Sequence, residues 1–153
     1  MSFRFKGLAP AEFAPLFALS DADLEVRGFR RMTVDAKPGF PCRVSLDDAE
    51  PGEEVLLISY EHQPAHSPFR AAGPVFVSRA ATAYVGSQVP PALRTRQLSL
   101  RAYDRGGNIV DAEVVDGSAI EPALERLFAR DDTDYVHVHN AKRGCFAARV
   151  ERA

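Results

Sequence analysis

The chain has 153 residues, a formal net charge of −2, and 46% hydrophobic against 26% charged side chains, which is typical of one globular domain and excludes a disordered or fibrous protein. So small a net charge provides no field that would hold a nucleic acid or an anionic membrane surface, and neither is expected as a partner. No apolar run approaches the roughly 18 residues that span a bilayer, residues 1–6 lack the apolar core of a secretory signal, and two cysteines are too few for a disulfide framework. We therefore expect a cytoplasmic protein with reduced thiols.

The first part of the chain predicts a short helix followed by extended structure. Apolar residues at helical spacing predict the helix within residues 10–19, where Pro10 can occupy the first turn without losing a hydrogen bond. From Leu24 onwards the apolar pattern predicts extended chain, which the sequence Lys37–Pro41 interrupts with a turn.

The middle of the chain predicts strands joined by turns. The apolar runs at 55–60 and 73–78 are typical of buried strands, and residues 61–72 between them, with two prolines, predict an ordered surface loop. Residues 97–103 alternate cleanly between apolar and polar, and a Gly-rich turn leads to a second extended segment at 109–115. This pattern predicts a β-hairpin.

The last part predicts a helix and two closing strands. Ser118 and Glu121 have the spacing of a capping box, so a helix is expected over about 119–130. Strands at 136–139 and 145–150 follow, around a turn at 140–144. The sum is an α+β fold over residues 1–153, in a single domain without a linker, with a mostly antiparallel sheet and two short helices.

Three stretches carry a resemblance to a known family: Pro38–Glu53, Gly73–Val77 and Val138–Phe146. With them the sequence resembles a family of uncharacterised bacterial proteins, the domain-of-unknown-function family twelve-oh-three, over nearly the whole chain. The resemblance implies a single stand-alone domain. The family has no established activity, so it implies no substrate, cofactor or catalytic residue.

His137 and His139 are candidate metal ligands. Two imidazoles at i and i+2 of one strand share a face and can reach one ion if another element supplies a third ligand. Candidates for that ligand are His62, His66, Cys42 and Cys145. The alternative is that the pair lines a half-buried sheet face and serves only packing.

The two cysteines are candidate nucleophiles. Cys42 adjoins Arg43, and Cys145 lies close to Arg143 and to the sequence His-Val-His-Asn, so a cation or an imidazole could stabilise a thiolate. In such a site His66, His137 or His139 would act as base and Arg43 or Arg143 would stabilise an oxyanion. The alternative is that both thiols are buried and inert.

A polar pocket for a small anionic ligand is the function that these residues favour. It requires the segments 38–44, 62–70 and 139–145 to converge, with Gly144 permitting a close backbone approach. Its cations and polar groups would be Arg43, His66, Arg70, Asn140, Lys142 and Arg143. The full set of catalytic candidates is Cys42, Arg43, His66, His137, His139, Asn140, Arg143 and Cys145.

Two other functions stay open at this point. One is a non-enzymatic interaction module with inert cysteines, and the other is a metalloprotein that uses the His-x-His strand. No nucleotide- or phosphate-binding fingerprint is present, so the sequence identifies no cofactor. It leaves the oligomeric state open as well.

Overall fold

The computed structural model describes residues 2–153, and its largest element is a six-stranded sheet with the order β5-β1-β9-β8-β6-β7. Every neighbouring pair in it is antiparallel. Its strands are β1 (Phe3–Lys6), β5 (Val85–Gly86), β6 (Gln97–Tyr103), β7 (Ile109–Asp116), β8 (Tyr135–Asn140) and β9 (Phe146–Arg152). The predicted hairpin of residues 97–115 is confirmed as β6 and β7.

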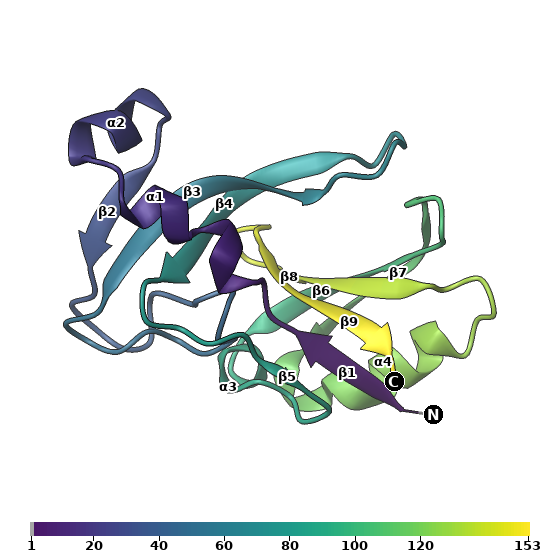
Figure 1. The fold of residues 1–153 in the computed structure, drawn as a ribbon. Helices are drawn as coiled ribbons and strands as arrows, with labels where there is room; N and C mark the ends of the chain where they lie inside the picture. Colours follow the sequence, from purple (N-terminus) through teal and green to yellow (C-terminus); the bar gives the residue numbers. More distant parts are fainter. Residues whose placement is uncertain (1) are drawn as a thin grey trace.

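A smaller antiparallel sheet has the order β2-β3-β4, and it lies against the face of the large sheet that is opposite helix α4 (Figure 1). Its strands are β2 (Arg30–Thr33), β3 (Glu54–Gln63) and β4 (Ala71–Ser78). The expected surface loop at 61–72 is therefore shorter than predicted, because β3 continues as far as Gln63, which pairs with Ala71. Strand pairing supplies the hydrogen bonds that a loop would take from water.

The helices are short. They are α1 (Ala14–Phe17), α2 (Asp21–Val26), α3 (Pro91–Arg94) and α4 (Ile120–Phe128), with 3₁₀ turns at Pro10–Glu12 and Gly117–Ala119. The two predicted helical regions are present, but α2 and α3 were not predicted. The extended structure expected from Leu24 begins only at β2, because the Ser20 side chain caps α2 by accepting a hydrogen bond from the Asp23 amide at 3.1 Å. None of the helices in residues 2–153 is long and apolar enough to span a lipid bilayer.

The expected capping box at Ser118 and Glu121 does not form. The N-cap residue of helix α4 is Ala119 and not Ser118, and it makes no side-chain capping hydrogen bond. Glu121 instead pairs with Arg94 of α3. A tertiary ion pair has thus replaced the local hydrogen bond that the sequence suggested.

Strand β8 is buried on both faces, and this determines where a site can lie. On one face Val136 and Val138 pack with Leu124 and Leu127 of α4. On the other face the small sheet covers the strand, and a second apolar cluster that includes Phe146 fills the space between the sheets. Side chains of β8 that point away from α4 therefore face the small sheet.

Candidate functional site

Strand β8 directs two histidine side chains away from α4. Because side chains alternate along a strand, His137 and His139 point to the opposite side from the two valines of the α4 core. Only 2% of His137 and 1% of His139 are exposed to solvent. The strand thus buries two nitrogen-bearing rings beneath the small sheet.

A third histidine reaches this pair from the small sheet. His62 lies near the end of β3, where the register with β4 shifts, and its ring centre is 4.9 Å from that of His139 and 6.0 Å from that of His137. One ring nitrogen of each histidine lies within 4.8 Å of the other two. Within the described part of the chain, no other group of His, Cys, Asp or Glu side chains has the spacing of metal ligands. These three residues are called the histidine cluster below.

The hydrogen bonds of the histidine cluster leave lone pairs free. His139 Nδ1 lies 2.9 Å from the carbonyl oxygen of Gly144, so Nδ1 carries the proton and donates it, and Nε2 keeps its lone pair. Neither His139 Nε2 nor the Nδ1 atoms of His62 and His137 have a hydrogen-bond partner, although all three are buried. Buried polar atoms are nearly always paired, so three unpaired nitrogens at one place require a reason.

Burial keeps the histidine cluster neutral. Loss of solvent lowers the pKa of His137 to about 2 and that of His139 to about 4, and it also lowers the pKa of His62. The aromatic rings of Tyr103, Tyr135 and Phe146 surround His137 and replace the water that would stabilise its charge. At neutral pH the cluster therefore presents lone pairs without protons to displace.

Arginines add positive charge beside the histidine cluster. Arg101 of β6 and Arg149 of β9 stand directly opposite His137 on the two neighbouring strands, and each lowers its pKa further. Arg149 pairs with Glu151 at 2.9 Å and lies 4.0 Å above the Tyr135 ring. Arg101 lies 3.5 Å from the Ser99 hydroxyl and interacts with the Tyr103 hydroxyl, but it forms no ion pair with any carboxylate in residues 2–153. The site therefore has one cation without a carboxylate partner.

A second group of polar side chains lies at the turn that follows β8. Arg43 Nη2 is 3.2 Å and Asn140 Nδ2 is 3.4 Å from the sulfur of Cys145, which is partly exposed. Arg43 reaches this place because Cys42 forms a parallel bridge with Phe76 of β4, and the Arg43 side chain then donates to the carbonyl oxygen of Phe146 at 2.7 Å. The turn thus supplies both Gly144 for His139 and Cys145 for Arg43.

Comparison with known families identifies the family of this chain. Residues 39–152 match the family described as "Protein of unknown function (DUF1203)". The chain belongs to the DUF1203 family. No curated protein and no solved structure matches the chain.

The part of the chain that matches DUF1203 contains every candidate side chain. The histidine cluster, Arg43, Asn140 and Cys145 all fall within residues 39–152, while β1, α1, α2 and β2 lie outside. Two surface hollows of about 300 and 510 Å³ are lined by residues 10–17, 44 and 78–79 and by residues 21–32, so neither touches the histidine cluster. The histidine cluster therefore lies outside both hollows.

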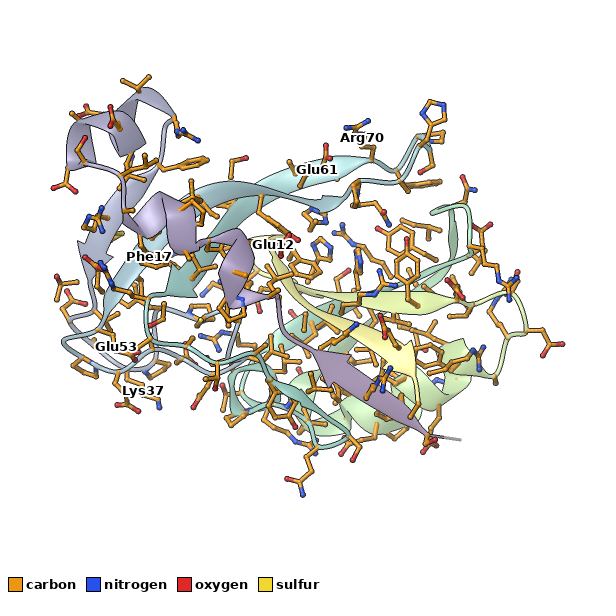
Figure 2. All side chains as sticks on the ribbon, viewed as in Figure 1. Glu12, Phe17, Lys37, Glu53, Glu61 and Arg70 are labelled. Atoms are coloured by element: carbon orange, nitrogen blue, oxygen red, sulfur yellow. The ribbon has the colours of Figure 1, made fainter. Side chains whose placement is uncertain are left out.

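The three segments expected to form one pocket meet only in part. Of segment 62–70 only its first residue joins the cluster; His66 is exposed, and Arg70 pairs with Glu61 on the outside of the β3–β4 hairpin (Figure 2). Cys42 is 2% exposed, and its sulfur accepts a hydrogen bond from the Ser78 amide at 3.3 Å. Lys142 and Arg143 are exposed in the turn. Arg43, and not the neighbour Arg143, is the arginine that contacts Cys145.

Sequence reasoning missed Arg101 and Arg149. Strand β6 alternates clearly, so the face of Arg101 could be read from its pattern, whereas β9 begins with three buried residues and gives no such signal for Arg149. What no local pattern shows is that β8 lies between β6 and β9 in a register that puts both arginines opposite His137. His62 was one of several possible third ligands, and only the path of β3 distinguishes it from the others.

Proposed function

We propose that this protein binds a divalent transition metal ion through His62, His137 and His139. The observation that supports the proposal is the convergence of three neutral imidazoles from two sheets, each with a buried nitrogen that lacks a hydrogen-bond partner. Nitrogen ligands 2.0–2.1 Å from a tetrahedral ion are about 3.3 Å apart, so nitrogens within 4.8 Å need to approach by at most roughly 1.5 Å. Small side-chain rotations supply such a shift.

The protonation state of the cluster favours metal binding. Imidazole ligates as the neutral base, and a proton competes with the ion wherever the pKa is near the ambient pH. With pKa values of about 2 and 4, His137 and His139 present no such competition at neutral pH. The bond from His139 Nδ1 to the Gly144 carbonyl also fixes the tautomer and the ring orientation, as outer-shell partners do in metal sites.

The ligand set favours zinc over the harder ions. Three imidazoles suit Zn²⁺, Cu²⁺ or Ni²⁺, while Mg²⁺ and Ca²⁺ require oxygen ligands that this group lacks. Three protein ligands leave one tetrahedral position for water or another ligand. We therefore describe the proposed centre as an open three-histidine site.

The open position is suited to a small anion. Repulsion from Arg101 and Arg149 opposes a bare dication, and an anion on the ion offsets that repulsion. Arg101 has no carboxylate partner among the described residues and is free to bind such a ligand. The proposal therefore combines two hypotheses of the sequence analysis, a small anionic ligand and a metal ion on the His-x-His strand. Arg101, and not the exposed arginines, is the cation that would contact the anion.

The test is elemental analysis of the tag-free protein, followed by a calorimetric titration of the chelator-treated protein with Zn²⁺. We expect near one ion per chain in the wild type and in His66→Ala, which changes an exposed histidine of the same hairpin. His62→Ala should lose the ion; because His62 is only half-buried, this variant is the least disruptive of the three. Equal zinc binding by His62→Ala and wild type, or a wild type that binds none, would refute the proposal.

We also propose that the protein is bacterial and that it is located in the cytoplasm. This location is supported by the two free thiols and by a net charge that attracts neither nucleic acid nor an anionic membrane. Cell fractionation with an antibody against the protein tests it. Recovery of the protein outside the cytoplasmic fraction would contradict it.

A further inference from the structure

The sulfur of Cys145 is held by two hydrogen-bond donors. Arg43 Nη2 at 3.2 Å and Asn140 Nδ2 at 3.4 Å both point at it, and among the described residues the sulfur donates to no acceptor. A sulfur that receives two bonds and gives none is in the environment of a thiolate. Cys145 is a partly exposed residue, in contrast to the buried Cys42.

Arg43 lacks any other counter-charge. Its side chain is 3% exposed, and its remaining bonds go to the carbonyl oxygens of Phe146 and Pro41. It forms no ion pair with a carboxylate anywhere in residues 2–153. Burial lowers its pKa, and both cysteines oppose that shift, Cys145 more than Cys42; only Cys145 also accepts a hydrogen bond from the guanidinium. A buried cation without an anion is costly, and Cys145 is the group that can provide the anion.

Asn140 provides an independent sign of a ligand. Its side chain is 9% exposed, and its Oδ1 atom is buried and has no hydrogen-bond partner, while its Nδ2 atom contacts the sulfur. An acceptor left unpaired beside an accessible sulfur can receive an N–H or O–H donor from a bound molecule. The exposed Lys142 and Arg143 in the same turn give that molecule positively charged surroundings.

We propose that Cys145 is a nucleophilic thiolate that exchanges with small anionic disulfides. The thiolate sulfur attacks one sulfur of the incoming disulfide, the S–S bond of that disulfide breaks, and a mixed disulfide with Cys145 forms while the other half leaves as a thiolate. The protein sulfur is oxidised, the leaving sulfur is reduced, and no further reductant is needed. Arg43 stabilises the attacking thiolate, and Lys142 and Arg143 attract the carboxylates of the reagent. Cys145 is not part of the histidine cluster, so this proposal does not rest on metal binding.

The first experiment uses dithiobis(nitrobenzoate), an aromatic disulfide with two carboxylates, on the native full-length protein. We expect one fast equivalent of released thiolate per chain, lost in Cys145→Ser and kept in Cys42→Ser, because Cys42 is almost fully buried. Arg43→Met should slow the fast phase by at least about tenfold, whereas Arg105→Met, which changes an exposed arginine in the turn between β6 and β7, should leave it unchanged.

A second experiment separates thiolate stabilisation from misfolding. The rate of alkylation of wild-type Cys145 by neutral iodoacetamide follows the thiolate fraction, so between pH 8 and pH 6 it should fall much less than the rate for the urea-unfolded chain. If circular dichroism shows that Arg43→Met is unfolded, the pH dependence of the wild-type alkylation rate is the deciding test. A native profile that matches the unfolded one, or a fast phase that survives in Cys145→Ser, would overturn the proposal.

Discussion

Mild acid should destabilise the metal-free protein through its buried histidines. The folded pKa values of His137 and His139 are about 2 and 4, whereas the ordinary value is 6.5. At pH 5 the unfolded chain therefore binds nearly two protons that the folded chain does not, and stability falls as the pH drops below 6.5. Each histidine contributes about 2 kcal/mol to this loss between pH 7 and pH 5, about 4 kcal/mol in total. The half-buried His62, whose pKa is also lowered, adds to the loss.

This magnitude is large compared with a typical domain stability of about 5–15 kcal/mol. It depends little on the folded pKa values, because both lie below pH 5. Aspartates and glutamates contribute little in this window, since the lowered pKa values of Glu54, Glu121 and Asp132 take effect only as the pH falls below about 5. The pH range 5–7 thus isolates the histidines.

The assay is urea unfolding of chelator-treated protein at pH 7, 6 and 5, followed by circular dichroism. His66→Ala should retain the full dependence on pH, because His66 is exposed. The double variant His137→Gln, His139→Gln should lose most of it, whatever its absolute stability. The reasoning is refuted if the wild type loses less than about 1 kcal/mol between pH 7 and pH 5, or if the double variant loses as much as the wild type.

Three further predictions concern close packing, a half-buried ion pair and the turn that orients His139. Gly117→Ala places a Cβ atom 1.8 Å from a backbone oxygen of α3 and should lower the free energy of unfolding in urea by about 3 kcal/mol. In Gly73→Ala the new Cβ meets nothing within 4 Å, and the loss should be at most about 1 kcal/mol. Equal losses would contradict the packing argument. Asp48 contacts Arg96 at 2.8 and 3.0 Å, so Asp48→Ala leaves that arginine without its partner and should lower the free energy of unfolding by about 3 kcal/mol. Adding Arg96→Met should recover part of this loss. No recovery would show that burial of an unpaired charge is not the cause. Gly144 has a φ of +81°, so Gly144→Ala should cost about 1 kcal/mol of stability. It should also weaken zinc binding roughly tenfold, because it moves the carbonyl that orients His139. An unchanged affinity in calorimetry would contradict that role.

The sequence by itself determined the features that depend on near neighbours. The alternation of residues 97–103 and the turn after them determined the β6–β7 hairpin, and the alternation in 136–139 put His137 and His139 on one face. Helix α4 follows from its apolar spacing, although its cap does not form as expected. Short-range patterns suffice here because the hydrogen bonds and the buried faces of these elements are set within a few residues.

Only the tertiary structure decided which side chains meet. His62 joins the histidines of β8 because β3 extends past its expected end and crosses the face opposite α4, and Arg43, rather than the sequence neighbour Arg143, reaches Cys145. Strand order and register follow from burying the apolar faces of both sheets together, which depends on the whole chain at once. A shift of one residue in β3 or β8 would turn its histidines to the opposite face. The local pattern therefore supplied the candidate residues, and the packing of the two sheets selected the site.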